Sequence, residues 1–211
     1  MMARLAVMVP ALVCSLALAG CWSTLPRQGG SATCSSNNHQ ISGNAWRPGV
    51  YAPQVGDSAH PKYESWYYAF DAWQDSYNTC GIEDDDVLLV TPTEVYRSLC
   101  YGYACQDGNN QVMDAAPCPG ASGCAWTWSA FGFLTEADIF VAGWSLNPVD
   151  NRKVEMHEVG HAIGLCHNGA CLPSGGYICD GNVMGYTSCA GEQLGRGDVS
   201  GVHLIYAGHT H

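Results

Sequence analysis

One stretch of this 211-residue chain decides its fold, and its sequence is His157-Glu158-Val159-Gly160-His161-Ala162-Ile163-Gly164-Leu165-Cys166-His167. A helix advances by about 100° per residue, so His157 and His161 lie on the same face, one turn apart. Two neutral imidazoles at that spacing can bind one Zn²⁺. Glu158 is rotated by about 100° from His157, which places its carboxylate beside the metal and not on it.

The last glycine and the last histidine of the stretch complete the predicted metal site. Gly164 stands where the chain is expected to leave the helix with a positive φ, and this turn brings His167 back as a third nitrogen ligand. Three protein ligands leave one position of a tetrahedral zinc for water, which is typical of a catalytic site. Glu158 can then act as the general base toward that water. The alternative is a helix whose histidines are only solvated or packed in the core.

The segments around this stretch predict an α+β fold with one domain over residues 45–211. Aromatic residues recur at helical spacing over residues 62–77, which predicts an amphipathic helix on the core. Short apolar runs predict strands, and a turn at residues 147–151 offers the N-cap of the histidine-bearing helix. The predicted strands are residues 87–90, 125–133 and 137–144, and the predicted later helices are residues 152–165 and a final one from Asp198 to Tyr206.

The N-terminus is typical of an exported protein. Residues 5–19 are apolar or small and follow one positive charge, and about 15 such residues are too few for a transmembrane helix. The segment ends in Leu18-Ala19-Gly20-Cys21, which resembles a bacterial lipobox. We therefore expect a signal peptide over 1–20, a lipid anchor on Cys21 and a flexible tether over 21–44. Ordinary cleavage and secretion is the alternative.

The cysteines support this division. The chain has 12 cysteines, and removing Cys14 with the signal peptide and Cys21 by lipidation leaves 12 − 2 = 10, an even number that favours five disulfides. The short-range candidate pairs are Cys100–Cys105, Cys118–Cys124, Cys166–Cys171 and Cys179–Cys189. A second zinc site made of Cys166, Cys171, Cys179 and Cys189 is the competing interpretation.

Composition excludes some classes of partner. The chain carries 8 Lys and Arg against 19 Asp and Glu, a net charge of −11, so nucleic acid is not an expected partner. Apolar residues make up 47% of the chain, which excludes a disordered protein. The acidic run Glu83-Asp84-Asp85-Asp86 offers oxygen ligands for a structural Ca²⁺ or forms a solvated turn, and both remain open.

The histidine stretch resembles the extended zinc signature of the metzincin metallopeptidases, and the closest likeness is to matrixin-like catalytic domains. Their Met-turn is matched by Asn182-Val183-Met184-Gly185-Tyr186, where Met184 would form an apolar floor under the imidazoles. Residues 135–141 resemble the edge strand that lines the matrixin cleft, and residues 198–208 resemble the C-terminal helix. The resemblance implies a zincin fold: a twisted mixed β-sheet, an active-site helix and a small irregular C-terminal subdomain that ends in a helix.

Two departures limit what the resemblance implies. No histidine lies between His60 and His157, which argues against the structural zinc of matrixins, and no cysteine-switch motif precedes the domain, although the thiol of Cys34 is formally available. Tyr186 follows Met184 by two residues, as in astacin-like and serralysin-like metzincins. There the tyrosine can bind zinc or donate to the oxyanion, and the alternative here is a packing tyrosine.

The resemblance implies a metalloendopeptidase with one catalytic Zn²⁺. It would hydrolyse peptide bonds of a protein or peptide substrate with metal-activated water and Glu158 as the general base. The substrate is expected to pair with the strand at Ala137–Val141, and the protein is expected to be a monomer that touches the membrane only through its anchor. A zinc amidase acting on cell-wall peptide and an inactive surface binding module are the alternatives.

Overall fold

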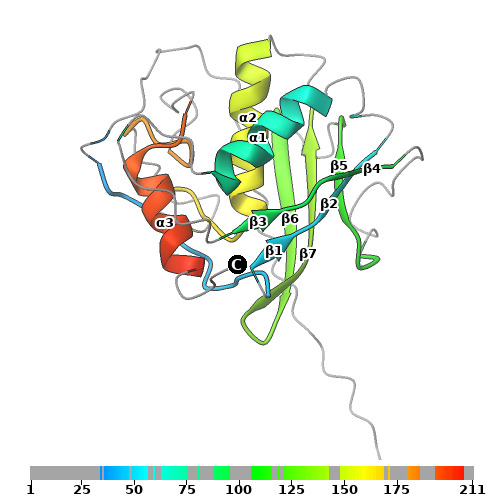
Figure 1. Cartoon of the computed structure of the whole chain (residues 1–211), viewed down its shortest axis with the longest axis horizontal. Helices are drawn as coiled ribbons and strands as arrows, with labels where there is room; N and C mark the ends of the chain where they lie inside the picture. Colours follow the sequence, from blue (N-terminus) through cyan, green and yellow to red (C-terminus); the bar gives the residue numbers. More distant parts are fainter. Residues whose placement is uncertain are drawn as a thin grey trace, which may run out of the picture.

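Figure 1 shows the computed structural model of the chain. The structure describes residues 34, 36–47, 49–56, 59, 63–75, 80, 88–95, 106–115, 118, 121–142, 148–168, 171, 180–185 and 193–206. Within these residues the fold is of mixed α and β type, as the sequence predicts, with a mixed sheet and three helices. The helices are α1 (Tyr63–Gln74), α2 (Pro148–Ala162) and α3 (Arg196–Tyr206).

The main sheet of the described region has five strands in the order β4-β2-β5-β7-β6. The strands β4, β2, β5 and β7 are parallel to their neighbours, and β6 alone runs antiparallel, against β7. A separate parallel pair joins β1 and β3. The strands are β1 (Val50–Tyr51), β2 (Pro53–Val55), β3 (Leu89–Val90), β4 (Thr93–Glu94), β5 (Asn110–Met113), β6 (Gly123–Ala130) and β7 (Phe133–Val141).

The structure corrects the prediction that residues 135–141 form an edge strand. On one side of β7, Ile139 pairs with Val112 of β5, and on the other it pairs with Ala125 of β6. Both backbone edges of β7 are therefore used, and the edge strands of the described sheet are β6, next to β7, and β4 on the opposite side. The hairpin that joins the two strands places β6 outside. A substrate cannot add to β7 without displacing one of its neighbours.

The turn of this hairpin lies inside the strand predicted at residues 125–133, and its sequence explains why that strand and the next, at 137–144, are displaced from β6 and β7. Phe131 and Gly132 form the two-residue connection, and both have positive φ, 54° and 83°. Turns of this kind usually carry Asn-Gly or Asp-Gly, so a phenylalanine gives no turn signal in the sequence. Phe131 is 99% exposed, and no packing inside the domain offsets its left-handed backbone conformation.

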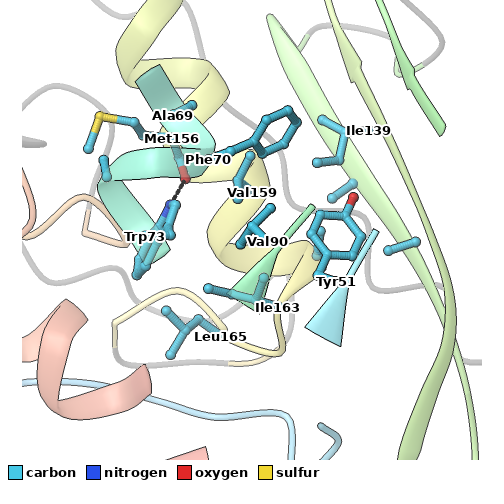
Figure 2. Close-up of a cluster of buried hydrophobic side chains, with 14 of the residues drawn as sticks. Tyr51, Ala69, Phe70, Trp73, Val90, Ile139, Met156, Val159, Ile163 and Leu165 are labelled. Atoms are coloured by element: carbon cyan, nitrogen blue, oxygen red, sulfur yellow. Dashed lines mark hydrogen bonds between the residues drawn. The ribbon is translucent and has the colours of Figure 1, made fainter. Parts of the chain in front are cut away.

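The core lies between the sheet and the two helices α1 and α2, which cross in Figure 1. The predicted aromatic face of α1 is confirmed, since Trp66, Phe70 and Trp73 are all buried. Trp73 also donates its indole N–H to the carbonyl of Met156 on α2 at 2.7 Å, which is the dashed line of Figure 2. This packing holds the histidine-bearing helix against the sheet, where Ile139 contributes to the same core.

Helix boundaries differ from the predictions by a few residues. The helix α2 begins at Pro148, within the predicted turn, because proline suits the first helical position, where no N–H is needed. It ends at Ala162, and Gly164 has the expected positive φ of 103°. No described helix is both long enough and apolar enough to cross a membrane.

Part of the predicted tether is packed against the domain. Residues 36–45 run along the segment after α2, where Ile41 forms a bridge with Leu165 and the Cys166 amide donates to the Gln40 carbonyl at 2.8 Å. Just before this segment, Cys34 is joined by a disulfide to Cys80. The predicted domain boundary at Ala45 therefore leaves out residues that pack against the domain. The sequence does not reveal this packing, because the contacts are with segments distant in the chain.

Three disulfides lie within the described residues. Cys118–Cys124 and Cys166–Cys171 confirm two of the predicted pairs, and Cys34–Cys80 was not predicted. The Cys166–Cys171 bond overturns the four-cysteine zinc site, since a disulfide offers no thiolate to a metal, and the Cys34 thiol is likewise not available for a switch. The other cysteines, including Cys21, and the acidic run at residues 83–86 lie outside the described residues, so the lipid anchor and the Ca²⁺ site stay predictions.

Candidate metal centre

The three predicted histidine ligands converge. His157 and His161 leave the same face of α2, and the segment after the helix brings His167 to them. The separations between their Nε2 atoms are 3.2 Å for His161–His157, 3.2 Å for His161–His167 and 3.0 Å for His167–His157. Nitrogens bound to one tetrahedral Zn²⁺ at about 2.1 Å lie about 3.4 Å apart. The observed triangle is therefore close to the size that a metal ion needs.

Backbone carbonyls orient two of the rings. The Nδ1 of His157 lies 2.8 Å from the carbonyl oxygen of Val183, and that of His161 lies 2.8 Å from that of Leu165. A carbonyl only accepts, so each Nδ1 carries the proton and donates it. The Nε2 lone pair of each ring is then left pointing to the centre, as metal-binding histidines require.

Burial keeps the imidazoles neutral. It lowers the pKa of His157 to about 3, with a further contribution from the neighbouring His161, and it lowers the pKa of His161 to about 4. The pKa of His167 is also far below its usual value because of burial and then the other two rings. At neutral pH the three rings are thus uncharged, and the Nε2 lone pairs of His157 and His161 face the centre of the cluster, where a cation would remove their mutual repulsion. The cluster could hold a metal ion, and three imidazoles suit transition metals such as zinc.

Glu158 lies beside this cluster and is completely buried, with 0% of its surface exposed. Among the described residues neither of its carboxylate oxygens has a hydrogen-bond partner. Burial raises its pKa well above the usual value, and the nearby backbone amide of Ala125 opposes part of this rise without meeting hydrogen-bond geometry. A buried carboxylate without partners is costly, and such groups are characteristic of functional sites.

Two glycines let the neighbouring elements approach α2. A Cβ on Gly123 of β6 would lie 2.6 Å from Val154 Cγ1 and 3.0 Å from Glu158 Oε1. A Cβ on Gly160 would lie 2.3 Å from the sulfur of Met184. A methyl group at either position would force these neighbouring side chains to shift, so glycine allows the observed close packing. These contacts are not detectable in the sequence, because the partners are distant in the chain.

The loop to the third ligand has the expected turn. Gly164 takes a positive φ, and a Cβ there would lie 2.5 Å from the carbonyl oxygen of Asn44. The amide of Ser42 donates to the Gly164 carbonyl at 2.9 Å. The Cys166–Cys171 disulfide closes a short loop around His167. The N-terminal segment and the disulfide thus constrain the ligand from both sides.

Met184 lies buried under the ligand helix, against Gly160, with 1% of its surface exposed. The turn that carries it is held by Asp198 of α3, whose carboxylate accepts from the amides of Val183 at 2.7 Å and of Met184 at 3.0 Å. Val183 is also the residue whose carbonyl orients His157, so α3 is coupled to the metal cluster. Tyr186 lies outside the described residues.

Asp198 is a functional neighbour that the sequence analysis did not find. It also accepts from the amide of Gly195 at 2.8 Å, which satisfies the N–H of the residue just before α3, as in a capping box. Burial raises the pKa of Asp198 to about 7, and its amide donors oppose part of this rise. An aspartate in the first turn of a helix is a detectable capping signal. Its contact with the turn 15 residues earlier is not detectable in one sequence.

Comparison with known proteins adds no assignment, since no protein-family model and no curated protein matches this chain.

Proposed function

We propose that this chain is a zinc-dependent endopeptidase. The observation that carries the proposal is the convergence of the His157, His161 and His167 Nε2 atoms within 3.0–3.2 Å. Next to them, on the helix of His157 and His161, lies the buried carboxyl of Glu158, to which no described residue forms a hydrogen bond. Three neutral nitrogen donors and one adjacent free carboxylate are the set required for hydrolysis by activated water.

The roles of the zinc ion and of Glu158 follow from their chemistry. When bound to the three histidines, Zn²⁺ would supply a Lewis acid that polarises the scissile carbonyl, activates water and lowers the pKa of the neighbouring carboxyl. Glu158 accepts the proton of the attacking water on one carboxylate oxygen and then delivers it to the leaving nitrogen. Since the described residues form no hydrogen bond to its oxygens, the carboxylate can exchange a proton without breaking contacts in that part of the chain.

The path of the substrate differs from the one the sequence predicts. We place an extended peptide along β6, the outer strand, because β7 is paired on both sides. The Ala125 amide of β6 lies near Glu158, which supports this strand as the one closest to the reaction. Backbone pairing of this kind binds a peptide with little dependence on side chains. Tyr186 stays the predicted donor to the oxyanion.

Export supports the same proposal. Disulfides persist in oxidising surroundings, and three lie in the described part of the chain. We therefore propose that the enzyme acts outside the cytoplasm, with Cys21 as the lipid anchor. Metabolic labelling with a fatty-acid analogue tests this placement: label that disappears with Cys21→Ala supports the anchor, and label that persists excludes Cys21 as its site.

The test of the function uses the purified chain and casein as a substrate. We expect cleavage that stops with a zinc chelator and returns when zinc is added. Glu158→Gln should keep the metal and lose the cleavage, and Glu64→Gln, at an exposed position of α1, is the matched control. Zinc binding with cleavage of cell-wall peptide but not of casein would favour an amidase. Zinc binding with no hydrolysis of either would indicate a binding module and contradict the proposal.

A further inference from the structure

One half-buried carboxylate gathers hydrogen bonds from several separate segments near the metal cluster. Asp180 accepts from Ser36 Oγ at 2.8 Å and from Asn38 Nδ2 at 3.2 Å, both in the N-terminal segment. It also accepts from Asn168 Nδ2 at 3.2 and 3.3 Å. From Asn182 it receives the backbone amide at 3.1 Å and the side-chain Nδ2 at 2.8 Å. The donors are neutral and the acceptor is a carboxylate, and hydrogen bonds to an ionised group are stronger than those between neutral groups.

Two of the donors adjoin the residues that form the metal cluster. Asn168 follows His167 directly and is almost fully buried, with 1% of its surface exposed, and its amide donates to the Met184 carbonyl at 2.8 Å. Asn182 precedes Val183, whose carbonyl orients the His157 ring. Asp180 is therefore linked to His167 through Asn168, and to His157 through Asn182 and Val183.

The amide of Asn182 is fixed on its other side as well. Its Oδ1 accepts from the Gly197 amide at 3.1 Å, which leaves its Nδ2 to face Asp180 and the Asn38 carbonyl, the latter at 3.4 Å. A Cβ on Gly195 would lie 2.0 Å from the same Oδ1, so Gly195 packs directly against this completely buried side chain. The contacts thus form a connected network from the N-terminal segment to the start of α3.

We propose that Asp180 is a positioning residue for the metal cluster. Its carboxylate holds the N-terminal segment, the loop that carries His167 and the turn that carries Met184 in one arrangement, so the imidazoles are in place before metal binds. The inference rests on the proposed zinc-binding function. Partners of this kind act on metal affinity through ligand orientation, and their loss typically weakens binding by about 10- to 100-fold.

The test measures zinc affinity of the folded chain by competition with a chromogenic chelator, and the thermal midpoint of the metal-free chain separately. Asp180→Asn keeps the size of the side chain but removes its charge and turns an amide toward donors. We expect at least tenfold weaker zinc binding. Glu64→Gln removes an exposed charge on α1 and should leave the affinity unchanged. A purely structural role would lower the midpoint and leave the affinity of the folded chain within twofold, which would overturn the proposal.

A milder variant covers the case in which Asp180→Asn does not fold. The double substitution Ser36→Ala with Asn38→Ala removes only the N-terminal donors and leaves the carboxylate in place. It should weaken zinc binding by about threefold or more, and an unchanged affinity would again overturn the proposal. A wild-type chain that binds no zinc would refute the proposed function itself. Tight zinc binding by the wild type and by Asp180→Asn alike would refute only the role of Asp180.

Discussion

Two carboxylates of this molecule, Glu158 on α2 and Asp198 on α3, are equally buried and yet held in opposite ways. Their exposed fractions are 0% and 1%. Asp198 accepts hydrogen bonds from three backbone amides, those of Val183, Met184 and Gly195. Neither oxygen of Glu158 has a hydrogen-bond partner among the described residues.

The difference separates a structural carboxylate from one available for chemistry. The three amides that donate to Asp198 fix the turn of Met184 and the start of α3, so its carboxyl group serves to hold the backbone. Glu158 packs against Gly123 of β6, and the Ala125 amide lies near it without meeting hydrogen-bond geometry. A group that destabilises the fold by its burial and gains no bond in return is explained by a role in the reaction.

Removing the Glu158 charge tests this contrast with the largest expected effect. In Glu158→Gln we expect kcat/KM to fall by about 10²- to 10⁴-fold, because the general base is lost. The free energy of unfolding of the metal-free chain should not fall, since an unpaired buried carboxyl is replaced by a neutral amide. Turnover and chemical denaturation check these two expectations, and the zinc content shows whether the metal is retained. Undiminished turnover would mean that Glu158 is not the base.

The raised pKa of Asp198 predicts that its contribution to stability depends on pH. The pKa of Asp198 is about 7 in the folded chain against 3.8 ordinarily, so the folded state holds a proton that the unfolded state has released between these values. The free energy of unfolding should therefore fall as pH rises from about 4 to about 7, by up to about 4 kcal/mol at about 1.4 kcal/mol per pKa unit. Denaturation of metal-free wild type and Asp198→Asn across this range checks it. Parallel curves for the two chains would contradict the raised pKa.

Truncation of Asp198 should then destabilise where truncation of Glu158 does not. Asp198→Ala leaves the amides of Val183, Met184 and Gly195 without their acceptor, and each lost bond costs about 1 kcal/mol or more. We expect a loss of about 3 kcal/mol, measured by denaturation near pH 5, below the raised pKa of Asp198. Glu158→Ala, measured alongside, should lose less. Equal losses in the two variants would remove the distinction between them.

A substitution at Gly123 tests whether packing alone places Glu158. The added methyl of Gly123→Ala would meet Val154 Cγ1 at 2.6 Å, so β6 or α2 must shift. Overpacking of this kind costs about 1–3 kcal/mol, and we expect turnover to fall with zinc still bound. Gly132→Ala has open space around its Cβ position and strains only its own backbone, whose φ is 83°, so it shows the effect of a strained substitution in the β6–β7 turn without the contact. Full activity in Gly123→Ala would show that the position of Glu158 does not depend on β6.

The sequence allowed the local part of the site to be predicted, and the reason is geometric. His157 and His161 are one helical turn apart, and Gly164 provides the turn toward His167, so residues within a short stretch specify the cluster. The outer position of β6 depends on pairing between strands, which the spacing of residues along one chain does not encode. The contacts of Asp198 and Asp180 likewise join segments that are distant in sequence.

X-ray absorption at the zinc edge of the purified chain tests the central claim most directly. We predict one zinc per chain with three imidazole nitrogens at about 2.0–2.1 Å and one oxygen ligand. In His161→Ala the bound zinc should be lost, and in Glu158→Gln the three nitrogens should remain. Sulfur ligands at about 2.3 Å, or a chain that binds no zinc while folded, would contradict the account.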